Sequence, residues 1–175
     1  GLVGAGRSEI ARAVFGVDPY DSGEVLLEGR AVHFKSTRQA IQSGLAMLQE
    51  DRKELSLFMG LPIWLNITIS RLPGISPGGI IVRKRIDELV KKFIRDFNIK
   101  IASLEYPVSS LSGGNQQKTT LARWLATEPK VLILDEPTHG VDVGAKAEIY
   151  KIMRQLAEQG MGVLLISSEL PEIVA

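Results

Sequence analysis

The chain has 175 residues, 45% hydrophobic and 23% charged, which is the balance of an ordinary globular domain. Its net charge of +1, from 21 Lys and Arg against 20 Asp and Glu, gives no sign of a nucleic-acid-binding surface. Because cysteine is absent, disulfides, thiolate zinc sites and cysteine nucleophiles are excluded. The sequence also contains no run of about 18 apolar residues, the length that a membrane-spanning helix needs.

In the first part of the chain, short helical and strand patterns alternate. The periodicity of apolar residues predicts these elements, and Gly and Ser residues mark where they begin and end. The elements are a helix from Gly6 to Gly16, a hairpin over 22–34 turning at Glu28-Gly29, a short helix capped by Ser36 and ending at Gly44, and a strand over 45–49. Residues 57–83 are predicted to be irregular, with 73–79 (PGISPGG) as a flexible stretch.

The second part of the chain has longer patterns. Six apolar residues between 86 and 97 recur at the i, i+3, i+4, i+7 spacing of an amphipathic helix. The later elements are a helix from LSGG to about Thr127, a strand over 130–137, a helix over 144–159 and a strand over 162–167. The continuous apolar strands predict an α/β fold with a parallel sheet covered on both faces. A helical insert, 57–128, would interrupt a core made of 1–56 and 129–175.

The chain opens on GLVGAGRS, residues 1–8, which has the spacing of a phosphate-binding loop with Arg7 in the lysine position. Glycines let the backbone N–H groups wrap a phosphate, and the helix that starts near Gly6 adds its positive end. Ser8 would then bind Mg²⁺. The alternative is a glycine turn that matches the motif by chance.

A second motif, VLILDEPT, places two carboxylates at the end of an apolar strand. Asp135 is the candidate Mg²⁺ ligand, directly or through water, and Glu136 is placed to polarise an attacking water. Two surface acids with no catalytic role are the alternative interpretation.

The third motif is LSGGNQQK, residues 111–118. Ser112 stands at a helix start before two glycines, which makes a second anion-binding helix terminus. One nucleotide does not need two such cradles, so this one is inferred to serve a nucleotide held by another domain. An ordinary serine cap with a glycine turn would not explain why both cradles occur together.

Together these motifs resemble the ATP-binding cassette (ABC) ATPases: GLVGAGRS is similar to the Walker A motif, LSGGNQQK to the signature, VLILDEPT to Walker B and HGVD (139–142) to the D-loop. The resemblance implies a P-loop fold, ATP and Mg²⁺ as ligands, and catalytic roles for Asp135 and Glu136. The nucleotide contacts that it implies are Gly1, Gly4, Ala5, Gly6, Arg7, Ser8, Glu9, Gln49, Glu50, Ser112, Gly113, Gly114, Asn115, Gln116, Asp142 and Ser168, with Ser8 and Asp135 on the metal.

GNQQK, EDRK (50–53) and GVDVGAK (140–146) give a narrower resemblance, to the second cassette of the duplicated ATPases of bacterial sugar importers. That group serves ribose, xylose, galactose and autoinducer-2. The resemblance implies a partner cassette in the N-terminal half of the same polypeptide, a transmembrane permease, a sugar-binding protein and a place on the inner face of the cell membrane. The chain is then expected to be a fragment of a longer polypeptide.

Three positions depart from the wider ABC pattern. Arg7 replaces the Walker lysine, although the second cassettes of sugar importers also carry arginine there. Ser168 stands where the switch histidine is expected, and either Gln49 or Glu50 takes the place of the Q-loop glutamine. These departures leave open a catalytically degenerate, regulatory half-site. A soluble ABC ATPase that acts on ribosomes or DNA is the rival from a different class.

Overall fold

A parallel sheet forms the centre of the molecule in the computed structural model, which describes residues 5–76, 80–169 and 172–173. Its strands, in spatial order, are β3 (Leu45–Leu48), β4 (Val131–Asp135) and β5 (Gly162–Ile166). Leu48 is level with Leu134, and Asp135 with Ile166, so all three strands end at one edge. The continuous apolar runs of β3 and β4 are buried because helices cover both faces of the sheet.

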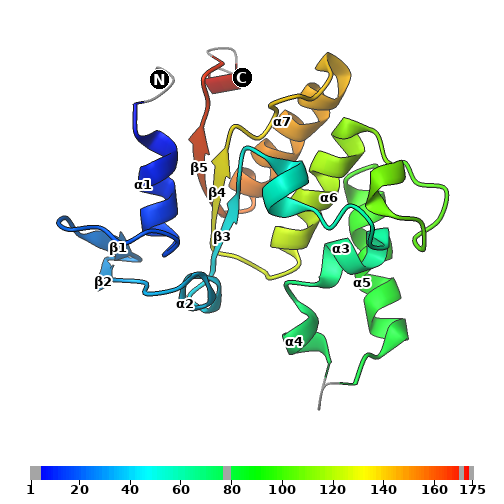
Figure 1. The fold of residues 1–175 in the computed structure, drawn as a ribbon, viewed down its shortest axis with the longest axis horizontal. Helices are drawn as coiled ribbons and strands as arrows, with labels where there is room; N and C mark the ends of the chain where they lie inside the picture. Colours follow the sequence, from blue (N-terminus) through cyan, green and yellow to red (C-terminus); the bar gives the residue numbers. More distant parts are fainter. Residues whose placement is uncertain (1–4, 77–79, 170–171, 174–175) are drawn as a thin grey trace.

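The two faces of the sheet carry separate hydrophobic clusters, because successive side chains of a strand point to opposite sides. Met47 and Ile133 pack under α1 (Arg7–Val14) and α2 (Thr37–Gln42). Leu48 and Leu134 face the opposite cluster, which takes in α6 (Gly113–Leu125) and α7 (Val143–Glu158). Figure 1 shows α1 on one side of the sheet and α6 and α7 on the other.

The hairpin lies outside this sheet and confirms the predicted turn. Strands β1 (Val25–Leu27) and β2 (Arg30–Val32) pair antiparallel, with Leu27 opposite Arg30. Glu28 and Gly29 between them both have positive φ, of 51° and 76°. Two central residues with positive φ are what a two-residue turn of type I′ requires.

The prediction that residues 57–83 are irregular is wrong. They contain α3 (Ile63–Thr68) and α4 (Leu72–Ile75), after a π-helical turn at Arg52–Ser56. Helix α3 begins directly after Pro62, and Ile63 and Ile67, four residues apart, are both fully buried. Residues 73–75 of the expected flexible stretch lie in α4, and 77–79 lie outside the described residues.

The remaining helices confirm the sequence pattern. Helix α5 (Arg83–Asp96) buries Ile86, Val90 and Phe93, and a 3₁₀ turn at Val108–Ser110 leads to α6. In Figure 1, α1, α6 and α7 all begin toward the end of the molecule where the strands end. The start of α1 lies beside the strand ends, whereas α6 and α7 begin further from them. In the part of the chain that the structure describes, no helix is long and apolar enough to cross a membrane.

Candidate functional site

A cavity of about 310 Å³ opens at the edge where the strands end. Its lining residues are Ala5, Gly6, Arg7, Ser8, Glu9, Glu50, Glu136, His139 and Ser168. The fold thus brings together residues from the first loop and from the segments that follow each of the three strands. Gly1 and Gly4 lie outside the described residues.

The start of α1 gives the cavity its anion-binding character. Gly6 has a left-handed φ of 76° and precedes the first helical residue, and its carbonyl accepts a hydrogen bond from the Ile10 N–H (3.1 Å). A side chain at this φ would be strained, although a Cβ there would meet no neighbour within 4 Å. The requirement for glycine is therefore one of backbone conformation.

Asp135, at the end of β4, is the buried carboxylate of the site. Only 4% of the residue is exposed, and its Oδ1 has no hydrogen-bond partner among the described residues. Burial raises the pKa of Asp135 above its ordinary value, and a hydrogen bond from the Ser8 hydroxyl opposes that shift. A buried oxygen without a partner is costly unless a ligand satisfies it.

The Ser8 hydroxyl and the Asp135 carboxylate together fit Mg²⁺. The ion prefers hard oxygen ligands and keeps most of its remaining positions for water and phosphate. No group of three or more His, Cys, Asp or Glu side chains that could hold a metal occurs in the described ranges. The hydroxyl of Ser8 and the carboxylate of Asp135 therefore suit an ion that arrives with phosphate groups better than a closed structural metal site.

Glu136 follows in a strained conformation, with a φ of 47°, while its N–H donates to the Ile166 carbonyl (2.9 Å). Its side chain lines the cavity. There, Oε2 accepts a hydrogen bond from the Ser168 hydroxyl (3.1 Å), and Oε1 lies 3.9 Å from a guanidinium nitrogen of Arg7. Ser168, expected to replace a histidine, therefore still contacts the candidate catalytic carboxylate.

Arg7 is engaged inside the protein. Its Nη1 donates to the Ser167 carbonyl (2.7 Å), and 24% of its side chain is exposed. One guanidinium thus links the start of α1 to the ends of β4 and β5. The planar guanidinium presents its N–H groups in a fixed geometry, whereas a lysine ammonium is a compact charge on a flexible stem.

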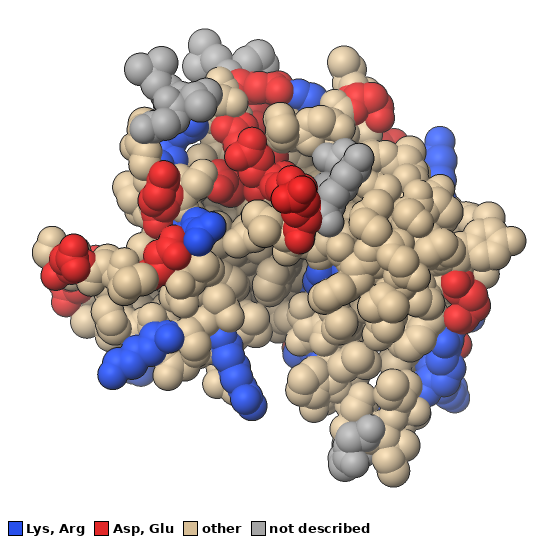
Figure 2. All heavy atoms as spheres, in the orientation of Figure 1, with Lys and Arg blue, Asp and Glu red and all other residues tan. Residues whose placement is uncertain are grey.

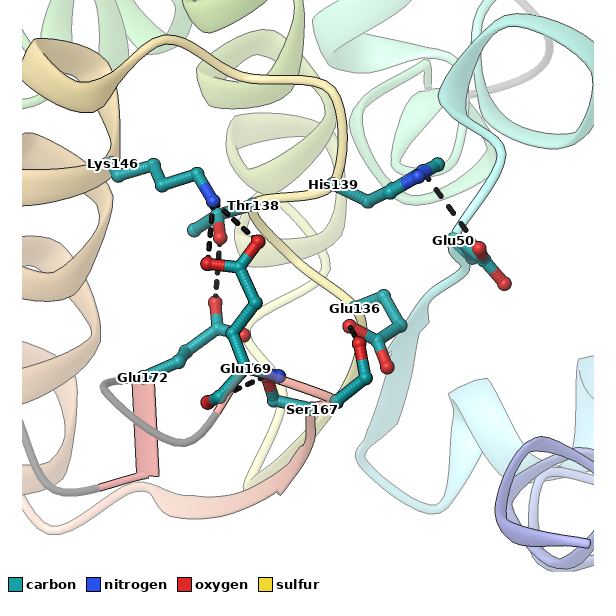
Figure 3. A network of polar contacts seen from close by, with 9 residues as sticks. Glu50, Glu136, Thr138, His139, Lys146, Ser167, Glu169 and Glu172 are labelled. Atoms are coloured by element: carbon teal, nitrogen blue, oxygen red, sulfur yellow. Dashed lines mark hydrogen bonds and ion pairs between the residues drawn. The ribbon is translucent and has the colours of Figure 1, made fainter. Parts of the chain in front are cut away.

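Glu50 and His139 lie on the outer wall of the cavity, with Oε1 and Nδ1 3.7 Å apart (Figure 3). Both side chains are more than half exposed. Glu50 lines the cavity, whereas Gln49, the other Q-loop candidate, is half-buried directly after β3. Around this edge of the molecule Asp and Glu side chains gather, as Figure 2 shows.

A polar network behind Glu136 was not foreseen from the sequence. Lys146 on α7 contacts Glu169, and the Thr138 hydroxyl donates to Glu172 (2.9 Å), so the segment after β5 is bonded to two other elements. Figure 3 shows these residues on the inner side of the loop that carries Glu136. The only signal in the sequence was the lysine at the end of GVDVGAK.

The signature residues form a second group, at the start of α6. Ser112 is exposed and its side chain makes no capping bond; instead its Oγ accepts from the Asn115 amide (3.0 Å). Asn115 in turn accepts from the Lys100 N–H (3.0 Å), and the Gln116 amide donates to the Leu111 carbonyl (3.0 Å). The interpretation of Ser112 as an ordinary N-cap thus lacks the bond that defines one.

Gly114 fits closely against α7. A Cβ on this glycine would lie 2.4 Å from the Cβ of Ala145. Asp142 caps α7 by accepting from the Ala145 N–H (3.0 Å), and its carboxylate lies beside Gly114. The structure therefore places Asp142 with the signature group, while Arg7, Ser8, Glu50, Glu136 and Ser168 surround the cavity.

Comparison with known proteins agrees with this arrangement. The family model described as ABC transporter matches residues 1–139, and the chain belongs to this family. A structure of CbiO1 from Clostridium perfringens, part of the ABC transporter complex CbiONQ, superposes with a TM-score of 0.76 over 97% of this chain and 65% of that chain. At 23% sequence identity this similarity shows the shared fold.

Among curated relatives, the chain is 47% identical to the ribose import ATP-binding protein RbsA of Geobacillus kaustophilus. It is 48% identical to a putative ribose/galactose/methyl galactoside import ATP-binding protein of Pseudomonas fluorescens. Each match covers 99% of this chain but only 35% and 34% of the relative, in its C-terminal half. The chain thus spans about a third of the length of the curated relatives that it matches.

Proposed function

We propose that this chain is the nucleotide-binding domain of an ABC importer for sugars, the second of two cassettes, which couples ATP binding and hydrolysis to uptake through a permease. The observation that carries the proposal is the buried Asp135, whose unpartnered oxygen lies beside Ser8 at the start of α1. Family membership supports ATP as the ligand, and the names of the relatives support sugar import.

Four residues at or beside the cavity then have a chemical task, namely Ser8, Asp135, Glu136 and Ser168. Ser8 and Asp135 hold Mg²⁺, which neutralises phosphate charge. The phosphates lie at the N-terminus of α1, where N–H groups and the helix dipole favour an anion. Glu136, with Ser168 on one oxygen, orients the attacking water and accepts its proton.

The signature group serves a partner. In this proposal residues 1–56 and 129–175 form the ATPase core and 57–128 the helical part. The first turn of α6, with Ser112, Gly113 and Gly114, contacts ATP on the partner cassette, and the two cassettes hold ATP head to tail between them. The exposed Ser112 and the rigid packing of Gly114 support this assignment.

The cavity of this chain is proposed to be the weaker of the two nucleotide sites. Arg7 is bonded to Ser167 and lies near Glu136, so ATP has to compete for it. Ser168 lacks the imidazole that would sense the γ-phosphate. A regulatory half-site that binds nucleotide without turning it over is the second candidate, and this engaged arginine is the observation that favours it.

Exposed apolar side chains support a permease contact close to the nucleotide site. Leu55 and Phe58 are 60% and 50% exposed, and both lie in the segment after Glu50. A segment joined to the cavity wall can transmit nucleotide binding to a membrane partner. We place the chain on the cytoplasmic face of the inner membrane, with a sugar-binding protein acting on the permease from the other side and no nucleic-acid partner.

The test uses the full polypeptide reconstituted with its permease and sugar-binding protein. We expect ATP-dependent sugar uptake, and photolabelling of this cavity by an azido-ATP analogue that requires Mg²⁺. Ser8→Ala should lower that labelling about tenfold, whereas Ser109→Ala, at an exposed serine away from the cavity, should not. Labelling that is independent of Mg²⁺ and Ser8 would contradict the assignment, and ATPase activity indifferent to the permease would favour a soluble, non-transport ATPase.

A further inference from the structure

The segment after β5 has to be placed accurately if Ser168 is to act on Glu136. A serine hydroxyl is one bond away from Cβ, so its reach depends almost entirely on where the backbone lies. The observed bond of 3.1 Å to Glu136 leaves little tolerance, because hydrogen bonds weaken steeply beyond about 3.5 Å. Something must hold this segment in place, and an exposed loop cannot do so alone.

Lys146 makes a second contact with this segment, in addition to the bond from Arg7 to the Ser167 carbonyl. Its Nζ donates to both carboxylate oxygens of Glu169, at 2.5 and 2.6 Å, one residue beyond Ser168. The lysine side chain is 20% exposed and the Glu169 side chain 45% exposed, so the pair lies at the protein surface with the lysine the better covered of the two. Glu169 raises the pKa of Lys146 through this hydrogen bond, so the lysine remains charged.

Both ends of this tie are themselves fixed. Lys146 lies in the first turn of α7, where Asp142 caps the helix and Ile149 is fully buried in the core. On the other side, the Glu169 N–H donates to the Ser167 hydroxyl (3.0 Å), which closes a tight turn around Ser168. A shift of the lysine would therefore move the serine.

We propose that Lys146 is a positioning residue for the nucleotide site: through Glu169 it holds the Ser167–Glu169 turn so that Ser168 keeps Glu136 in its working orientation. The inference rests on the proposed function of the cavity. Lys146 lies on α7 outside the lining of the cavity, so it acts on Glu136 through Glu169 and does not contact the nucleotide. Figure 3 shows Lys146, Glu169, Ser167 and Glu136 along this path.

A matched pair elsewhere in the chain supplies the control. Lys130 binds Glu28 with an Nζ to Oε2 distance of 2.7 Å, but at the opposite end of β4 and with both side chains more than half exposed. Lys146→Met and Lys130→Met remove the same charge and retain similar apolar stems. Lys146→Arg retains the charge, and the exchange Lys146→Glu with Glu169→Lys restores the pair in reverse.

The first measurement is amide hydrogen exchange in the nucleotide-free full polypeptide. Lys146→Met should speed exchange at residues 167–169 about tenfold, because outer partners of functional groups typically have effects of that size. Lys130→Met should leave these amides unchanged, and both Lys146→Arg and the reversed pair should restore protection. Unchanged exchange in Lys146→Met, or equal changes in both Met variants, would overturn the inference.

The second measurement separates positioning from mere stability. In single-turnover experiments with ATP at this site, Lys146→Met should lower the rate of hydrolysis about tenfold while the dissociation constant for ATP stays within about twofold. A parallel loss of affinity would contradict a role through Glu136. If the wild type binds no ATP here, the proposed function fails, and the exchange measurement alone still decides the role of Lys146.

Discussion

The cavity at the start of α1 and the signature at the start of α6 are built in opposite ways. Around the cavity, charged side chains hold one another: Arg7 bonds to Ser167 and lies near Glu136, which also accepts from Ser168. At the signature, Gly114 packs onto α7 with no room for a methyl group. Contacts between polar and charged groups hold the first region, whereas close packing of a glycine against a helix holds the second.

Buried polar contacts also hold α6, the helix that begins at the signature. Lys118, with a side chain only 4% exposed, donates to Glu148 on α7 and to the Asn98 carbonyl, both at 2.7 Å. The Gln117 amide donates to the Pro137 carbonyl (2.6 Å), which ties the same helix to the loop after Glu136. The chain therefore forms its signature as a closely packed backbone surface and its own cavity from contacts between polar and charged groups.

The largest expected effect separates the two regions directly. Ser112→Arg puts a cation at the positive end of α6, where we propose that phosphate from the partner binds, and should lower the ATPase activity of the assembled transporter about 100-fold or more. Arg7→Ala should lower it less than about tenfold, because the P-loop backbone still binds phosphate. ATPase assays in proteoliposomes measure both.

Ser109→Arg is the matched control for this pair, since it adds the same side chain at an exposed serine just outside α6. Its activity should stay close to that of the wild type. Equal losses from Ser112→Arg and Arg7→Ala would contradict the proposed asymmetry between the two nucleotide sites.

A second test concerns the rigidity of the signature. Gly114→Ala should lower the free energy of unfolding by about 1–3 kcal/mol, because the new methyl group meets Ala145 well inside contact distance. Adding Ala145→Gly makes room and should recover most of that loss. Urea unfolding of the full polypeptide measures both variants.

Gly60→Ala provides the comparison, since a Cβ there meets nothing within 4 Å. Its effect should stay within about 0.5 kcal/mol. If Gly114→Ala were as mild as Gly60→Ala, the contact between α6 and α7 would be softer than proposed.

Features that depend on residues close together in the sequence could be predicted, whereas features that depend on contacts between distant residues could not. The long helices α5 and α7 follow from periodicity, because one buried face imposes a repeat on the residues themselves. The strands of the sheet follow from continuous apolar runs, because both of their faces are covered. Helix α3 was missed because two of its four buried residues, Asn66 and Thr68, are polar, which leaves only Ile63 and Ile67 as an apolar signal. Its Asn66 bonds to Phe58 and Leu61, contacts that no spacing rule predicts.

The site shows the same division. Motif spacing predicted that Ser8, Asp135 and Glu136 would meet, since strand ends converge at one edge of a parallel sheet. The ties of Arg7 to Ser167 and of Lys146 to Glu169 could not be predicted, because they join residues 160 and 23 positions apart through the direction of single side chains. Such contacts depend on helix placement to within an ångström.

A third test examines the cost of keeping Asp135 charged. Because burial raises its pKa above the ordinary value, the charged form is disfavoured in the folded protein. Asp135→Asn should therefore raise the free energy of unfolding of the nucleotide-free protein by about 1 kcal/mol at pH 7, while weakening Mg²⁺-dependent nucleotide binding. Denaturation in EDTA and binding in Mg²⁺ measure the two opposite effects.

The pH dependence gives this test its sign. As the pH falls through the raised pKa, wild-type Asp135 takes up a proton and loses its penalty, so the gain from Asp135→Asn should shrink toward acid. Asp21→Asn, at an exposed carboxylate, should show no comparable gain at pH 7. A destabilised Asp135→Asn at pH 7 would mean that the carboxylate is satisfied in the nucleotide-free protein.

The smallest effect concerns the negative charge around the cavity. Glu9, Glu50 and Glu136 all line it, so an arriving phosphate meets several carboxylates (Figure 2 shows acids gathered at this edge). Glu50→Gln removes one of them and restores the neutral amide of the wider family, and should tighten Mg²⁺-ATP binding about threefold at low salt, since one unit charge nearby contributes on the order of 1 kcal/mol or less in water. The gain should fade as salt rises, because exposed charges are screened within about 10 Å at 0.1 M.

Glu54→Gln, which removes an exposed charge outside the lining of the cavity, should change affinity less. Weaker binding by Glu50→Gln would show instead that Glu50 contributes to holding the metal, as a ligand in addition to Ser8 and Asp135.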